Sequence, residues 1–215
     1  MVSLLALCAL APSRLTVGTN WGGEESLHYT SKADEIDESR RQKLFFRVTG
    51  KEDDLWVVQT QVTLLESKVG GVLMPPPPYK DPTISKAWLS PEGTLLYEDP
   101  FDHGTFELDR LIAMWLPANL PDEWTLDLST TVEKQVTKGV AKLTSFGQPS
   151  GTSRGYRLTF TSGGDAPQMS ATGVLWFDAG DGRLLSAQIE AKDALLPGST
   201  ERAHVTLAYR DSRTK

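Results

Sequence analysis

The residues best suited to acid–base chemistry lie in one short stretch of the chain. Asp99, Asp102 and His103 are near neighbours, and an imidazole beside a carboxylate can act as a general base. The competing interpretation is a polar loop that caps the segment after it. No nucleophile elbow, zinc helix, phosphate loop or dinucleotide fingerprint is found in the sequence, and this favours the structural interpretation. We therefore expect a protein that is not an enzyme, and a hydrolase using Asp102 and His103 is the least favoured alternative.

Patterns for binding a metal are also missing from the sequence. The chain has three histidines on separate segments, without neighbours at ligand spacing: His28, His103 and His204. Asp178, Asp181 and Gly182 resemble part of a calcium loop, but the twelve-residue pattern that ends in glutamate does not follow. We interpret 178–183 as a hairpin turn, and we expect no metal and no cofactor.

Tryptophan residues are the remaining candidates for a binding site. The chain has six of them, more than a compact β-domain core needs. Within the expected strand 169–177, Trp176 lies on the face opposite Leu175 and Phe177, so both faces of that strand carry large apolar groups. Such a sheet can fold around a helix or around a ligand cavity. We expect a ligand site lined by Trp88, Phe106, Trp115 and Trp176; simple filling of a large core is the alternative.

The elements that would position these side chains are mostly strands, because apolar and polar residues alternate along much of the chain. Two such runs, 44–49 and 56–64, predict a long hairpin. The clearest hairpin joins 169–177 to 184–191, across a turn whose Gly and Asp residues accept positive φ. Further strands are expected at 124–128, 156–161 and 204–209. The fold class predicted is mainly β (α+β), an antiparallel meander that forms a curved sheet or half-barrel.

One segment, residues 106–116, departs from this alternation. Its apolar residues recur at the spacing of one helix face: Leu108, Leu111, Ile112 and Trp115. Acidic residues fall in its first turn, and Pro117 ends it. The sequence predicts one amphipathic helix packed on the sheet.

Composition and charge restrict the partners. With 39% hydrophobic residues the chain can form a core, and its net charge of -6 opposes binding to nucleic acid, which requires clustered cations. The densest basic run, at 40–43, follows acidic residues at 34–38 that neutralise its field.

The N-terminus, residues 1–18, is expected to be a signal peptide and to direct export. Its apolar run over 1–11 has the length of a signal-peptide core and is too short to span a membrane, although no Lys or Arg precedes it and Pro12 follows it. A short buried strand or helix is the alternative. Cys8, the single cysteine, lies in this run, so the mature chain would form no disulfide. Residues 5–8 partly match a lipobox, which leaves lipidation of Cys8 open.

The rest of the chain is expected to be one domain. The β-rich domain covers 19–210, a Pro-rich connector at 74–82 divides it into halves, and 211–215 form a tail that frays from Arg210 on.

The expected helix, the passage 116–124 after it and the closing hairpin around 175–183 together carry a resemblance. The chain resembles uncharacterised exported bacterial β-rich proteins that are broadly similar to the lipoprotein-carrier (LolA/LolB-like) half-barrel. That resemblance would cover about residues 25–210 and implies no catalytic residues. The leading expectation is a non-enzymatic exported envelope protein that binds a lipid-like apolar ligand or an envelope protein partner. A structural or assembly component with a solid core is the alternative.

Overall fold

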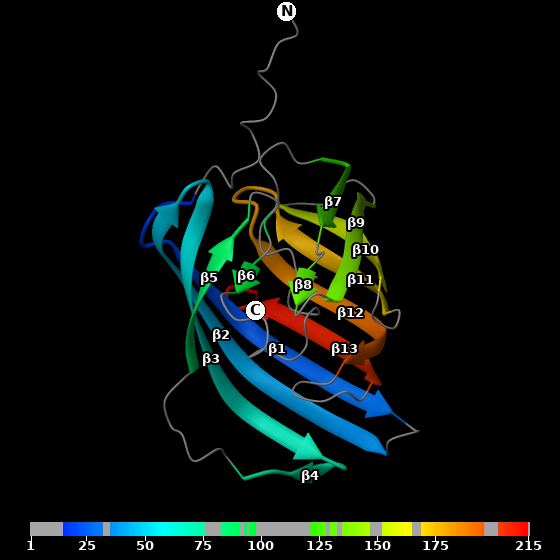
Figure 1. The fold of residues 1–215 in the computed structure, drawn as a ribbon. Helices are drawn as coiled ribbons and strands as arrows, with labels where there is room; N and C mark the ends of the chain where they lie inside the picture. Colours follow the sequence, from blue (N-terminus) through cyan, green and yellow to red (C-terminus); the bar gives the residue numbers. More distant parts are fainter. Residues whose placement is uncertain are drawn as a thin grey trace, which may run out of the picture.

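The computed structural model describes residues 15–31, 35–75, 83–90, 93, 95–97, 121–127, 130–132, 135–146, 152–164, 169–195 and 202–214. Within these residues the protein is mainly β. Thirteen strands join one sheet in which all paired strands are antiparallel (Figure 1). Eleven of them form its continuous path, and the path does not close, because the end strands β6 and β7 each pair with a single neighbour. The predicted fold class is confirmed as a mainly β, antiparallel, curved open sheet.

The sheet consists of two wings that meet at the first and last strands of the chain. The N-terminal wing contains, from the edge inward, β6 (Leu95–Tyr97), β5 (Thr83–Leu89), β3 (Leu55–Val69), β2 (Ile36–Glu52) and β1 (Asn20–Ser31). The C-terminal wing continues with β13 (Arg202–Asp211), β12 (Leu184–Leu195), β11 (Ser170–Asp178), β10 (Ser153–Gly164), β9 (Gln135–Ser145) and β7 (Glu123–Asp127). Two short strands lie off this path: β4 (Val72–Leu73) beside β3 and β8 (Thr130–Val132) beside β9.

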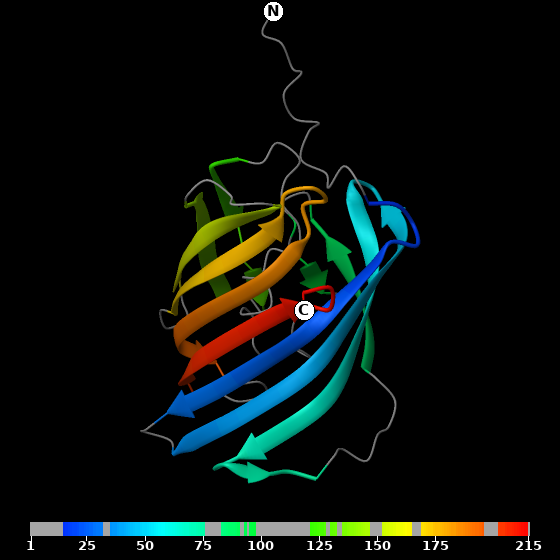
Figure 2. The same ribbon diagram turned by 180° about the vertical axis from the view of Figure 1, so that it is seen from behind.

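The central pairing of β1 with β13 holds the two wings together. It runs from Gly23 opposite Asp211 to Thr30 opposite His204. Figure 2 shows these strands side by side in the middle of the sheet. A simple meander would leave the first and last strands at opposite edges, so this pairing is the part of the topology that strand patterning did not predict.

Several predicted elements are confirmed. The hairpin of β2 and β3 and the hairpin of β11 and β12 are both present. In the second hairpin, Oδ1 of Asp178 accepts hydrogen bonds from the backbone N–H groups of Gly180 and Asp181, at 2.7 and 3.2 Å. The interpretation of 178–183 as a turn therefore holds, because the carboxylate is used inside the turn itself.

Other predictions fall outside the described residues or differ from the structure. The helix predicted over 106–116 lies outside the described residues, as do most of the signal peptide and of the Pro-rich connector. The C-terminus does not fray at Arg210: β13 continues to Asp211, which is 1% exposed, and Asp211 accepts hydrogen bonds from Arg213. The expected tail is tied down because the buried carboxylate of Asp211 pairs with Arg183 and Arg213, contacts that strand patterning does not reveal. Leu15 is also buried, inside the segment assigned to the signal peptide.

The two faces of the sheet differ in composition. Alternate residues of each strand are buried, as in β13, where Ala203, Val205 and Leu207 lie on one face while His204 and Thr206 lie on the other. We call these the core face and the polar face. On the core face one continuous cluster of buried side chains spans both wings, and its largest fully buried members are Tyr29, Tyr156, Phe46, Phe177, Leu89, Leu95, Leu126 and Leu143.

Candidate functional site

The structure describes two of the four residues of the predicted ligand site. Trp88 lies on β5 and Trp176 on β11, in opposite wings, and neither lines the groove described below. Phe106 and Trp115 lie outside the described residues, and so do Asp99, Asp102 and His103. Of the predicted site residues that the structure describes, Trp88 and Trp176 therefore do not lie together.

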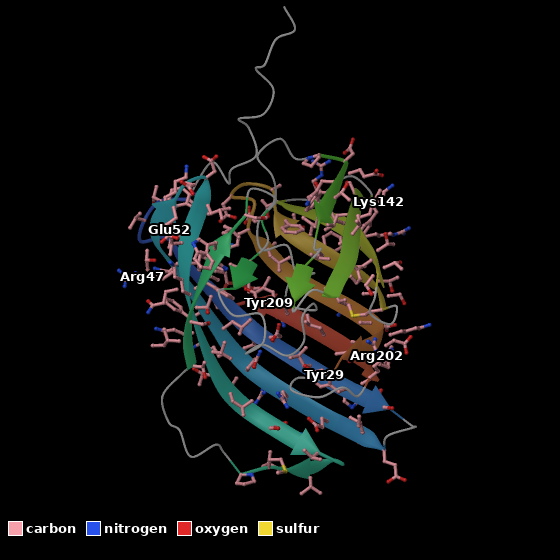
Figure 3. All side chains as sticks on the ribbon, viewed as in Figure 1. Tyr29, Arg47, Glu52, Lys142, Arg202 and Tyr209 are labelled. Atoms are coloured by element: carbon pink, nitrogen blue, oxygen red, sulfur yellow. The ribbon has the colours of Figure 1, made fainter. Side chains whose placement is uncertain are left out.

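Trp88 has a local role at the end of the N-terminal wing. Its Nε1–H donates a hydrogen bond to Oε2 of Glu52 at 2.7 Å, and Nζ of Lys86 lies 4.5 Å from its ring centroid. The hydrogen bond from Trp88, together with one from Lys86, lowers the pKa of Glu52 below its ordinary value. Figure 3 labels Glu52 near the tip of the long hairpin. These contacts attach β5 to the end of β2.

Trp176 is a partly exposed aromatic residue on the polar face. It is 38% exposed, and its ring packs edge-on against Phe146 with 5.3 Å between centroids. Gly155 is opposite Trp176 in the sheet, and a Cβ there would lie 2.8 Å from Phe146 and 3.0 Å from Trp176. The glycine thus leaves the space in which the two rings meet.

A groove of 920 Å³ crosses the polar face next to this pair. It reaches from β3 in one wing to β10 in the other. Each strand that lies between β2 and β10 in the sheet contributes residues that pair with those of its neighbours. Two cross-strand rows supply its side chains. The first row is Arg41, Ser26, Ala208, Gln188, Val174 and Arg157. The second row is Ser39, His28, Thr206, Glu190, Thr172 and Thr159.

The lengths of these side chains explain the hollow. Where β1 meets β13, the first row contributes the small residues Ser26 and Ala208, and the second row contributes Thr206 and the larger His28. Arg41 lies toward one end of the first row and Arg157 at the other, so long side chains stand on either side of a short floor. The groove is therefore a consequence of register, since these residues come from segments 26–41 and 157–208 of the chain.

The charges at the two ends of the groove are arranged differently. At the β2 end the polar groups are paired: Arg41 lies 3.9 Å from Glu66, and His28 Nε2 lies 2.9 Å from Oδ1 of Asp37. Lys68, 2.6 Å away, lowers the pKa of Glu66 through a hydrogen bond. At the β10 end the guanidinium of Arg157 stacks over Phe146 at 5.4 Å and has no ion pair among the described residues.

A second polar cluster lies on the core face, near the start of β1 and the end of β13. Glu25 and Asp211 are each 1% exposed, and Tyr209 between them is 2% exposed. Arg183 Nε approaches Asp211 Oδ2 at 3.5 Å, and Gln42 donates a hydrogen bond to Glu25. Burial raises the pKa of Tyr209, and the neighbouring carboxylate of Asp211 raises it further.

Three buried aromatic donors on the core face have no acceptor in the described part of the chain. They are Oη of Tyr209, Nε1 of Trp56 and Nε1 of Trp124. Buried polar groups are normally hydrogen bonded, and an unpaired one costs about 1–3 kcal/mol. These three donors are therefore enclosed by the core without a hydrogen bond to the described residues.

The fold and these two surfaces define the class of protein as a mainly β protein with an open antiparallel sheet. No family model matches the chain, and no curated protein is significantly similar to it. Across the described ranges, no three His, Cys, Asp or Glu side chains are grouped to hold a metal ion, and no helix has the length and apolar character needed to cross a bilayer.

Sequence reasoning missed both clusters for the same reason. The groove forms only when seven strands are paired in the correct register. The polar cluster on the core face forms only when β1 pairs with β13. A signal for the second was present in Glu25, a charged residue at an apolar position of an alternating strand.

Proposed function

We propose that the protein is a non-enzymatic exported envelope protein whose sheet, as a half-barrel, binds an apolar, lipid-like ligand on its core face. The observation that carries this proposal is the open sheet, whose apolar core face spans both wings and retains buried donors without acceptors. A lipid-like molecule supplies both an apolar body and ester or carboxyl acceptors. Tyr209 is the donor that would orient such a ligand, because it lies beside the charged groups Glu25, Asp211 and Arg183.

Chain connectivity adds a second support. The sheet ends at β6 and β7, and residues 98–122 join these two edges. That segment includes the predicted helix with its apolar stripe of Leu108, Leu111, Ile112 and Trp115. In this proposal the helix covers the core face and the ligand lies between the helix and the sheet, with Phe106 and Trp115 in contact with it.

The test is lipid analysis of the native protein. The protein is purified from its own envelope fraction without detergent, extracted, and examined by mass spectrometry for a stoichiometric bound lipid. In parallel, the delipidated protein is titrated with the fluorescent probe N-phenyl-1-naphthylamine. We expect a bound lipid, with less of it recovered from the Tyr209→Phe variant, and we expect the delipidated protein to bind the probe. Absence of both lipid and probe binding would refute the carrier function.

The alternative, a structural or assembly component of the envelope with a solid core, is favoured by a different observation. The groove described above lies on the polar face, whereas the core-face side chains are closely packed. Export itself is tested separately, by locating the protein after cell fractionation and by sequencing its mature N-terminus. Because Leu15 is buried in the core, we expect processing to spare it.

A further inference from the structure

The groove on the polar face supports an inference that is independent of the proposed core-face ligand. We propose that it is a binding site for an uncharged glycan chain. Its length fits an extended ligand: seven strands, from β3 to β10, contribute to it, and six spacings of about 4.8 Å give about 29 Å.

The charge pattern selects a neutral ligand. The lining includes three arginines and two glutamates. At the β2 end Arg41 and Arg40 are already paired with Glu66 and Glu38, and His28 contacts Asp37. A polyanion would meet these carboxylates, and a polycation would meet the arginines. A neutral ligand avoids the repulsion between like charges in both cases.

The free hydrogen-bonding groups select a ligand rich in hydroxyls. In the described structure Arg157, Gln188 and Glu190 have no side-chain hydrogen bond or ion pair to protein. The guanidinium of Arg157 donates hydrogen bonds, the amide of Gln188 both donates and accepts them, and the carboxylate of Glu190 accepts them. Thr159, Thr172 and Thr206 contribute hydroxyls from the neighbouring row. A sugar hydroxyl donates one hydrogen bond and accepts others, so it can use this mixture where a plain anion or cation cannot.

An aromatic pair at the β10 end supplies the apolar contact that a sugar ring needs. Trp176 is two residues along β11 from Val174, on the same face, and it packs against Phe146, over which Arg157 stacks. A sugar ring has apolar C–H faces, and an exposed indole can pack against them while polar side chains reach the hydroxyls at its edge. Polar rows and an aromatic end therefore lie in one continuous surface.

The experiment uses the full chain and defined hexasaccharides. Cellohexaose, chitohexaose, laminarihexaose and maltohexaose are titrated by calorimetry, with an oligogalacturonate of the same length and an uncharged peptide as comparators. We expect at least one neutral hexasaccharide to bind with Kd below about 1 mM, and we expect weaker or no binding of the comparators. No binding of any neutral hexasaccharide, or tighter binding of the acidic glycan or the peptide, would overturn the proposal.

Matched variants locate the site. Arg157→Ala and Gln188→Ala should each weaken glycan binding by about tenfold, because hydrogen bonds from charged and amide groups are lost. Arg47→Ala is the control, since Arg47 is another exposed arginine of the sheet, on β2 outside the groove (Figure 3). If all three variants bind the glycan with equal affinity, the glycan binds elsewhere and the assignment to this groove is wrong. Probe binding on the core face should be unchanged in all three, which separates this inference from the carrier function.

Discussion

Removing the hydroxyl group of Tyr209 should stabilise the protein. In the described structure this hydroxyl is buried without a hydrogen-bond partner, and its ring lies over Gly23, where a Cβ would be 2.8 Å away. An unpaired buried polar group costs about 1–3 kcal/mol, and loss of one oxygen leaves little space. Tyr209→Phe should therefore raise the free energy of unfolding by about 1 kcal/mol, or the Tm by roughly 2–4 °C for a chain of this size.

Tyr156 provides a matched control of opposite sign. It is equally buried, but its Oη donates to the carbonyl oxygen of Pro121 at 2.9 Å. Tyr156→Phe loses that hydrogen bond and should cost about 1 kcal/mol. Urea unfolding of the ligand-free variants, monitored by circular dichroism, measures both changes. If Tyr209→Phe destabilises as much as Tyr156→Phe, the hydroxyl has a partner and the argument from unpaired donors is refuted.

The same tyrosine gives the protein an alkaline limit. Burial and the neighbouring carboxylate raise the pKa of Tyr209 above its ordinary value of 10.0, so the unfolded chain loses this proton at lower pH than the folded one does. The stabilisation is complete below pH 10 and is lost as pH rises above it. Unfolding free energies measured across this range should fall in the native protein, and the Tyr209 contribution to the fall should disappear in Tyr209→Phe.

Three other predictions concern surface contacts and the helix. Gly155→Ala places a methyl group 2.8 Å from Phe146, so it should cost about 1–3 kcal/mol in urea unfolding; an unchanged stability would mean that the rings are not held there. Trp88→Phe removes the main hydrogen bond to Glu52, so the carboxyl pKa measured by NMR should rise toward 4.5, and an unaltered titration would contradict this cause. Trp115→Ala should cost about 3–5 kcal/mol if Trp115 is a core residue, whereas a small loss together with abolished probe binding would favour the carrier function.

Much of the fold could be predicted from the sequence because each strand encodes its own burial. The alternation at 44–49 and 56–64 predicts β2 and β3, and Gly and Asp at 178–183 predict the turn between β11 and β12. These signals are local, with a period of two residues. The pairing of β1 with β13 joins residues about 180 positions apart, and no local pattern encodes it. The groove on the polar face and the polar cluster on the core face both depend on that pairing. The sequence patterns that predict the strands therefore could not predict these candidate sites.

The central pairing also explains why one sheet can present two independent surfaces. Adjacent residues of a strand point to opposite faces, so Leu207 lies in the core cluster while Thr206 and Ala208 line the groove. On β1 the buried Glu25 and the exposed Ser26 are separated in the same way. A shift of one residue in this register would exchange the faces and bury the groove side chains, most of which are polar. The groove and the core face therefore depend on the same register between β1 and β13. It follows that a substitution at the groove floor, such as Ala208→Leu, should block the groove without disturbing Tyr209, because its side chain points away from the core face.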